Sequence, residues 1–364
     1  SKNVNEDINY VIKDSNSIDV TNLFNITRNY SVGNYINSLI RFNNDVPLGE
    51  YIVYAYIDDS LYETFKIDIS NYMENISGEG TEDNPFIITN PVQLDMIRLN
   101  KYNYYKLGND IDLTYDTQNE NGLFYNEGLG WDPISYSSCT SSNSSGLYCS
   151  DGFSGIFDGD NHKIIGLYIN RPNENAVGLF RNTYNTNFSG LNFRNIILKN
   201  VNITGNNYVG GLIGYAYGTT YERTLIFENI SVTGNIRGNN YVGGLIGYFK
   251  GGTGLNNYLV PNTECTKRHC LNNLFNSSKI EGNNYIGGIV GLLETQDYYN
   301  VDNIKWRSTI DGYNWQNNGT IITNNNGAGL IGHVVINNGN IVTLNNSGMI
   351  DDDIVDMKIT WELI

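Results

Sequence analysis

The chain has 364 residues, which allows two or three domains and a sizeable hydrophobic core. Its 22 Lys and Arg against 38 Asp and Glu give a formal net charge of −16 and an isoelectric point near 4.5. Nucleic acids and anionic membranes attract proteins through clustered Lys and Arg, so this composition argues against both as partners. An acidic surface instead suits solubility, cation binding or a negatively charged cell-surface layer.

No apolar run reaches the ~18 residues that a membrane-spanning helix needs, so we expect no membrane insertion in this chain. The first residue is not Met and no signal peptide is visible, which indicates a processed protein or a fragment of a longer one. Sixty asparagines favour a source that grows at moderate temperature, because hyperthermophile proteins tend to be poor in this residue.

The first 77 residues alternate between apolar and polar side chains, as half-buried strands do. The predicted strands occupy residues 19–27, 35–42, 51–57 and 64–69. Several short strands in so small a segment predict an immunoglobulin-like β-sandwich for residues 1–77.

The next segment carries the best helix signal of the chain, at residues 90–99. Thr89 or Asn90 can act as the N-cap, and Pro91 suits the first helical position. Val92, Leu94 and Ile97 are predicted to form its apolar stripe. A solenoid exposes an apolar end that must be covered, so we expect this helix to cap the repeats that follow.

A short glycine-rich phrase recurs five times in the rest of the chain. The copies occupy residues 176–180, 208–214, 241–247, 285–291 and 327–332. Their glycines, from Gly178 to Gly329, are 33, 33, 44 and 41 residues apart, and such a period is the signature of a solenoid. Short β-branched runs broken by Gly and Asn favour strands over helices. We therefore predict that residues 78–350 form a right-handed parallel β-helix with the motif glycines stacked on one sheet.

Glycine and asparagine have separate expected roles in each coil. Glycine lets neighbouring backbones approach closely, while asparagine tolerates the left-handed conformation that a coil corner requires. The additional 8–11 residues of the two longer repeats are expected to be loops that leave the solenoid at one corner.

The repeated phrase resembles the GLUG motif of secreted and cell-surface proteins of bacteria and archaea. The copies at 209–214, 242–247, 286–291 and 329–332 carry the resemblance, and the segments 80–88, 104–113, 131–134 and 153–162 are similar to the usual entry into such repeats. The similarity spans residues 78–350 and implies a β-helix in an adhesin-like or surface-layer-like protein. Such repeats also accompany IgA-specific metallopeptidases, but the H-E-x-x-H signature of that chemistry does not occur here.

Four cysteines fall into two close pairs, Cys139 with Cys149 and Cys265 with Cys270. Both pairs lie in predicted insertions, where a disulfide would hold a loop that the core cannot order. We predict two local disulfides and hence an extracellular location. A metal site that also uses His269 is the alternative, although the spacing is not that of zinc sites.

Two acidic segments are the candidates for chemistry. Residues 158–162 offer two carboxylates and a histidine for acid/base work, but a turn between strands explains the same residues. For a cofactor we expect none, or Ca²⁺ at the weak candidates Asp110, Asp112, Asp158 and Asp160, because hard oxygen ligands suit this ion. Solvated turns remain the alternative. No G-x-S-x-G motif or P-loop occurs, and we expect no enzyme.

Ten Asn-x-Ser/Thr sequons occur, close to what chance gives in so asparagine-rich a chain. Asn143 and Asn318 lie in loop-like stretches and are the best glycosylation candidates.

The last residues, 351–364, are predicted to form a separate C-terminal strand after an acidic link. Met357, Ile359, Trp361 and Leu363 would share one face of this strand. A lone amphipathic strand must find a partner. It can cover the last coil of its own solenoid, or it can add to the N-terminal sandwich of the next subunit and so build a head-to-tail filament.

The sequence therefore favours a non-catalytic extracellular structural protein that self-associates as a surface-layer or filament subunit. A glycan- or host-binding adhesin is the alternative, because 28 tyrosines, many beside asparagine, suit sugar binding as well as strand formation. A polysaccharide-active enzyme is a third interpretation. The ligand, the source organism and the symmetry of an assembly are not encoded in any motif.

Overall fold

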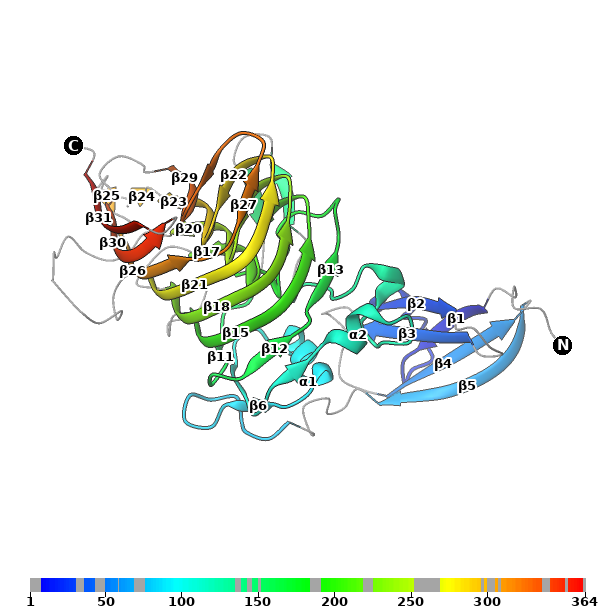
Figure 1. Ribbon diagram of the computed structural model, residues 1–364. Helices are drawn as coiled ribbons and strands as arrows, with labels where there is room; N and C mark the ends of the chain where they lie inside the picture. The colour runs from blue at the N-terminus through cyan, green and yellow to red at the C-terminus, as the bar shows by residue number, and fades with distance from the viewer. Residues whose placement is uncertain are drawn as a thin grey trace.

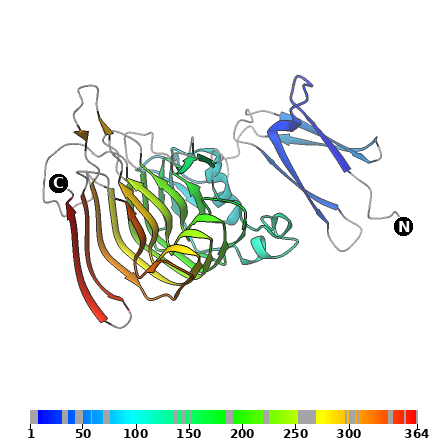
Figure 2. The ribbon, with the colours of Figure 1, turned by 90° about the horizontal axis from the view of Figure 1, so that it is seen from above.

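The computed structural model shows a small N-terminal β-module followed by a long parallel β-solenoid (Figures 1 and 2). The structure describes residues 8–30, 36–42, 50–57, 59–68, 76–134, 139–142, 146–149, 152–183, 191–218, 225–251, 269–295, 298–299, 305–306, 309–335, 341–350 and 353–362. Both views place the two chain termini at opposite ends of the molecule.

The N-terminal module consists of two small antiparallel sheets. One has the order β1 (Ile8–Lys13), β4 (Glu50–Ile57), β5 (Ser60–Asp68), and the other pairs β2 (Phe24–Tyr30) with β3 (Ile36–Phe42). Its core includes Ile12, Phe24, Tyr51 and Val53. The predicted strands are present, except that residues 21–23 form the 3₁₀ turn η1 (Thr21–Leu23) before β2. The immunoglobulin-like topology stays a prediction.

The predicted capping helix forms α1 (Pro91–Met96) and continues as the 3₁₀ turn η2 (Ile97–Leu99). The Asn90 side chain accepts a hydrogen bond from the Gln93 backbone N–H at 2.9 Å, as an N-cap does. Leu94 and Ile97 are fully buried in the solenoid core, but Val92 is 45% exposed. The predicted apolar stripe was therefore wrong at Val92, because residues two apart do not share a helix face.

Three β-sheets form the sides of the solenoid. The long sheet runs in the order β31 (Asp353–Glu362), β30 (Ile341–Ile350), β26 (Thr309–Asn317), β21 (His269–Gly282), β18 (Leu225–Arg237), β15 (Leu191–Thr204), β11 (Ile156–Asp158), β7 (Tyr104–Leu107), β6 (Phe86–Ile88). The narrow sheet consists of β16 (Asn207–Val209), β19 (Asn240–Gly243), β22 (Asn284–Gly287) and β28 (Gly327–Ala328). The middle sheet consists of β14 (Phe180–Asn182), β17 (Ile213–Tyr217), β20 (Ile246–Gly251), β23 (Val290–Thr295) and β29 (Ile331–Val335).

Shorter elements complete the chain. Beside the long sheet lie β8 (Ile111–Asp112), β12 (Lys163–Ile165), β13 (Tyr168–Asn170) and β27 (Ile321–Thr323). The remaining elements are α2 (Thr114–Gln118), η3 (Asn126–Gly128), and the hairpins β9 (Cys139–Ser142)–β10 (Gly146–Cys149) and β24 (Tyr298–Tyr299)–β25 (Lys305–Trp306).

Each coil visits the long, narrow and middle sheets in that order, and equivalent strands of successive coils pair in parallel. The three sheets enclose one continuous apolar core, to which β18 contributes Phe227, Ile230 and Val232. The parallel β-helix is thus the observed architecture, and the handedness of its coils stays a prediction.

The repeated glycines stack along the solenoid, as predicted, but at a corner rather than within a sheet. A Cβ at Gly211 would lie 2.6 Å from the Gly244 carbonyl oxygen, and one at Gly244 would lie 2.2 Å from the Gly288 oxygen. These glycines sit between the narrow and middle sheets, where the backbones of adjacent coils touch. No side chain fits there, which is why the motif repeats glycine.

The longer repeats differ at one place in the coil. The gap between a middle-sheet strand and the next long-sheet strand runs from Tyr217 to Leu225 in one coil and from Gly251 to His269 in the following one. The additional length therefore falls between the middle and long sheets, and residues 252–268 themselves lie outside the described residues.

The C-terminal strand β31 pairs antiparallel with β30, and Met357, Ile359 and Trp361 lie within it. Of the two interpretations of this strand, the one in which it covers its own solenoid is the one observed. Leu363 lies outside the described residues.

Candidate functional site

Of the predicted calcium carboxylates, Asp112 and Asp158 end the strands β8 and β11, whereas Asp110 and Asp160 lie between strands and face basic groups. Asp110 lies 3.2 Å from the Lys163 ammonium and 3.4 Å from His162 Nδ1, and Asp160 lies 2.9 Å from the Lys106 ammonium. The Lys163 backbone N–H, more than its ammonium, holds the pKa of Asp110 below its usual value. These carboxylates are engaged by protein cations, and calcium binding there stays a prediction.

Residues 158–162 form a turn, in which Asp160 and Asn161 have positive φ angles of 47° and 63°. Asp158 accepts hydrogen bonds from the Asp160 backbone N–H at 2.9 Å and from Arg194 Nε at 2.8 Å. Burial opposes ionisation of Asp158, yet these donors together hold its pKa below the usual value. The turn interpretation of this segment is therefore the observed one. Asp112 likewise accepts a bond from the Thr114 backbone N–H at 2.9 Å. Among the described residues, no group of three or more His, Cys, Asp or Glu is arranged to hold a metal.

The cysteine predictions lie partly in described segments. The register of the β9–β10 hairpin places Cys139 opposite Cys149. Cys270 is buried on β21 and takes part in a disulfide, whereas Cys265 lies outside the described residues. Both predicted pairings stay predictions.

The two glycosylation candidates are placed differently. Asn318 is exposed just after β26, and Asn143 lies outside the described residues.

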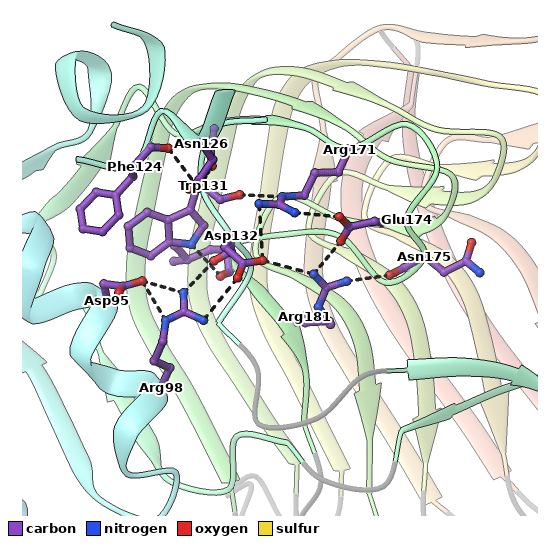
Figure 3. A network of polar contacts seen from close by, with 12 residues as sticks. Asp95, Arg98, Phe124, Asn126, Trp131, Asp132, Arg171, Glu174, Asn175 and Arg181 are labelled. Carbon is purple, nitrogen blue, oxygen red and sulfur yellow. Dashed lines mark hydrogen bonds and ion pairs between the residues drawn. The ribbon is translucent and has the colours of Figure 1, made fainter. Parts of the chain in front are cut away.

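A network of three arginines and three carboxylates joins the capping helix to the first coils (Figure 3). Arg98 on η2 binds Asp95 at 2.6 Å and also donates to the Asp132 carbonyl oxygen at 2.8 Å. Arg171 and Arg181 both approach Asp132 Oδ1, at 3.6 and 3.5 Å.

Glu174 closes the network. Its carboxylate oxygens bind Arg171 and Arg181 at 2.7 Å each, and Arg181 also donates to the Asn175 carbonyl oxygen at 3.3 Å. Burial disfavours the charged form of Glu174, but Arg171 and Arg181 outweigh it and lower its pKa. The three positive and three negative charges balance, and their contacts hold the capping helix against the first coils.

Asparagine side chains form hydrogen-bonded ladders along the outside of the solenoid. In the first ladder each Nδ2 donates to the Oδ1 of the preceding coil. Its members are Asn175, Asn207, Asn240, Asn284 and Asn325, with bonds of 3.2, 2.8, 2.8 and 2.8 Å. A second ladder on the long sheet has the members Asn195, Asn229, Asn273 and Asn314, with bonds of 3.0, 2.7 and 2.9 Å. Asn195 donates in turn to Asp158, which ends this ladder. The ladders bind each coil to the one before it.

Five tyrosines pack outside the core, at the corner between the narrow and middle sheets. We call Tyr208, Tyr215, Tyr241, Tyr248 and Tyr285 the outer tyrosine cluster. The rings of Tyr208 and Tyr241 stack at 5.1 Å and 4°, and those of Tyr241 and Tyr285 at 5.1 Å and 9°. Tyr215 and Tyr248 stack at 4.7 Å and are each 3% exposed.

The stacking offsets the strain of an unusual backbone conformation. Tyr208, Tyr241 and Tyr285 have φ angles of 60°, 57° and 60°, a conformation that costs an L-residue ~1–2 kcal/mol. Each aromatic pair contributes about 0.5–1.5 kcal/mol beyond its buried area, which offsets much of this strain.

The cluster also contains a buried polar contact. The Tyr248 hydroxyl donates to Glu294, whose other oxygen lies 3.1 Å from the Lys250 ammonium. Burial, reinforced by Tyr215 and Glu294, raises the pKa of Tyr248, so this phenol is not a base at neutral pH. In the stacked column the tyrosines turn their ring faces to one another, which leaves edges and hydroxyls rather than free faces for a sugar ring.

Sequence reasoning missed both the arginine network and the ladders. The ladders had a signal, since Asn-Asn precedes three of the motif copies and the paired asparagines keep the repeat spacing. The network had none, because its residues are spread over residues 95–181 and no period connects them.

No family model matches the chain. Among curated proteins, it is 29% identical over 165 residues to a protein described as a Gly-rich membrane protein of Evansella cellulosilytica. It is also 29% identical over 159 residues to halomucin of Haloquadratum walsbyi. Each match covers 43% of this chain but only 15% and 2% of those much longer relatives. Within the described residues, no helix has the length and apolar character needed to span a bilayer. The chain is thus similar, over less than half its length, to proteins of surface or membrane type.

Proposed function

We propose that this chain is a non-catalytic extracellular structural protein, a subunit of a surface layer or filament that assembles head to tail. The observation that carries the proposal is the continuity of the solenoid. One core, the asparagine ladders and the tyrosine stack run through successive coils, which favours a stiff rod. The similarity to a membrane protein and to halomucin supports a place at the cell surface.

The proposed contact joins two sheet edges. Among the described strands, β31 ends the long sheet, and β1 and β5 end the three-stranded sheet of the N-terminal module. Pairing with β30 occupies one edge of β31 and leaves its other edge for a strand of the next subunit. Since the termini lie at opposite ends of the molecule, this contact does not close on itself and extends a filament (Figure 2).

The experiment uses two shortened chains with complementary deletions. One lacks residues 354–364 and the other lacks residues 1–75; circular dichroism first checks that each is folded. Sedimentation and electron microscopy should show polymers of the intact chain, no polymers of either shortened chain, and one-to-one dimers of their mixture. Polymers of the chain without residues 354–364, or an intact chain that stays monomeric, would refute the head-to-tail proposal.

A glycan-binding adhesin remains the second candidate, because the half-buried Tyr208, Tyr241 and Tyr285 each directly follow an asparagine of the first ladder. A glycan array separates the two. Specific binding by the monomer that is lost on Tyr241→Ala, with the fold intact, favours the adhesin. Release of reducing ends from an arrayed polysaccharide would instead contradict the non-catalytic assignment.

A further inference from the structure

The last repeat departs from the others at three consecutive positions. Strand pairing aligns Ile286 with Gly327 and Gly287 with Ala328, so Tyr285 corresponds to Asn326. In place of tyrosine, an apolar residue and glycine, this coil therefore carries asparagine, glycine and alanine. The neighbouring Gly-Leu-Ile-Gly of the motif is retained at residues 329–332.

The glycine position of interior coils has no space for a side chain. A Cβ at Gly287 would lie 2.1 Å from the Val290 carbonyl oxygen and 2.5 Å from the Gly332 backbone nitrogen of the next coil. The equivalent Cβ at Gly243 would lie 2.1 Å from the Ile246 oxygen and 2.7 Å from the Gly291 nitrogen of the coil after it. These contacts involve backbone, which cannot yield as a flexible side chain does. The two oxygens belong to the glycine's own coil and the two nitrogens to the following coil, so stacking of a following coil adds its own requirement for glycine here.

Ala328 has a methyl group at this position and is exposed. We propose that the 326–328 segment is a built-in stop, which prevents a further coil, from this chain or from a second copy, from stacking on the narrow sheet. The methyl group of Ala328 occupies the space that the backbone of such a coil would need. An open solenoid end presents unpaired strand edges, so a stop of this kind guards against edge-to-edge association.

Asn326 and Gly327, the two residues before Ala328, also disfavour the stacking of a further coil. The positions aligned with Gly327 hold Val209, Val242 and Ile286 in earlier coils, each fully buried in the core. Glycine at the last position removes an apolar side chain that only another coil would cover. Asn326 likewise puts a polar residue where the preceding coils have tyrosine, and the ring of Tyr285 packs against His333 at 4.6 Å. This inference is independent of head-to-tail assembly, which uses the edge of the long sheet.

The test places alanine at Gly287, the interior position that aligns with Ala328. In Gly287→Ala, the alanine should reject the coil that follows it, so backbone amides in residues 321–335 should lose their protection from hydrogen exchange. Amides in residues 191–251 should keep their protection, because the coils before the substitution remain stacked. The matched control is Gly282→Ala, where the nearest atom is the movable Cδ1 of Ile286 at 2.5 Å, and it should leave residues 321–335 protected.

Retained protection of residues 321–335 in Gly287→Ala, or equal loss in the control, overturns the proposal. Ala328→Val provides a second test that does not depend on the folding of Gly287→Ala. Because β28 is the last described strand of the narrow sheet, the larger side chain should leave the melting temperature close to that of the native chain. A large decrease would show that backbone lies over this residue and that it is not a stop.

Discussion

Asn240→Ala measures what an asparagine ladder contributes. Asn240 donates to Asn207 Oδ1 and accepts from Asn284 Nδ2, both at 2.8 Å and both half-buried. The substitution removes two hydrogen bonds, at ~1 kcal/mol each, and leaves one acceptor and one donor without a partner. Because these groups are only partly accessible to water, leaving them without a hydrogen-bond partner adds a further free-energy cost to that of the two lost bonds. We expect the free energy of unfolding to fall by about 2–4 kcal/mol.

Asn325→Ala is the matched control, because Asn325 is the last rung of the same ladder. It donates to Asn284 at 2.8 Å, is itself exposed, and within the described part of the chain accepts no ladder bond from a later coil. Its removal should cost at most about 1 kcal/mol, since one hydrogen bond is lost where water can replace it.

Urea unfolding followed by circular dichroism gives the free energies, and hydrogen exchange locates the loss. Repeat proteins can unfold in parts, so the exchange data decide whether the two coils around Asn240 open first. Equal costs for Asn240→Ala and Asn325→Ala, or no cost for either, would show that the ladder bonds merely replace bonds to water.

Three further predictions follow from the geometry. Gly244→Val should lower the melting temperature sharply, because its Cβ would lie 2.2 Å from the Gly288 carbonyl oxygen; an unchanged value contradicts the stacking. Glu174 has a lowered pKa in the folded state, so its stabilisation is complete above its ordinary pKa of 4.5 and is lost as pH falls through the folded value. Glu174→Gln should reduce the loss of unfolding free energy that the native chain shows as the pH falls below 4.5. An unaltered dependence on acid pH would contradict the contribution of the network. Mass spectrometry without reduction should find all four cysteines blocked; alkylatable thiols would refute the disulfides and the extracellular inference drawn from them.

Much of the fold could be predicted because it is periodic. The spacing of Gly211 and Gly244 gave the coil length, and short β-branched runs such as residues 231–233, separated by Gly and Asn, identified the strands. The N-cap at Asn90 follows from local chemistry alone. These signals are strong because each depends on neighbours in the sequence or on a repeat.

The sites were harder to predict because they depend on the shape of the coil. The motif glycines were expected within a sheet, but they sit at a corner where Gly211 meets the backbone at Gly244. The tyrosines were interpreted as strand formers or sugar ligands, whereas Tyr208 and Tyr241 stack on each other in a left-handed backbone conformation. The cluster around Asp132 joins side chains from separate coils, and one sequence contains no record of which coils meet.

The asparagine ladders have a direction. In both ladders the amide N–H groups point toward the N-terminal end and the oxygens toward the C-terminal end, as backbone groups do in an α-helix. Aligned amides add their dipoles, so each of these two ladders carries an axial polarity; the Asn276–Asn317 bond, in which Asn276 donates to the following coil, has the opposite direction. Its positive end on the long sheet meets the Asp158 carboxylate, as an acidic residue meets the start of a helix. The two ends of each of these ladders are therefore electrically unlike, with amide N–H groups at the N-terminal end and amide oxygens at the C-terminal end.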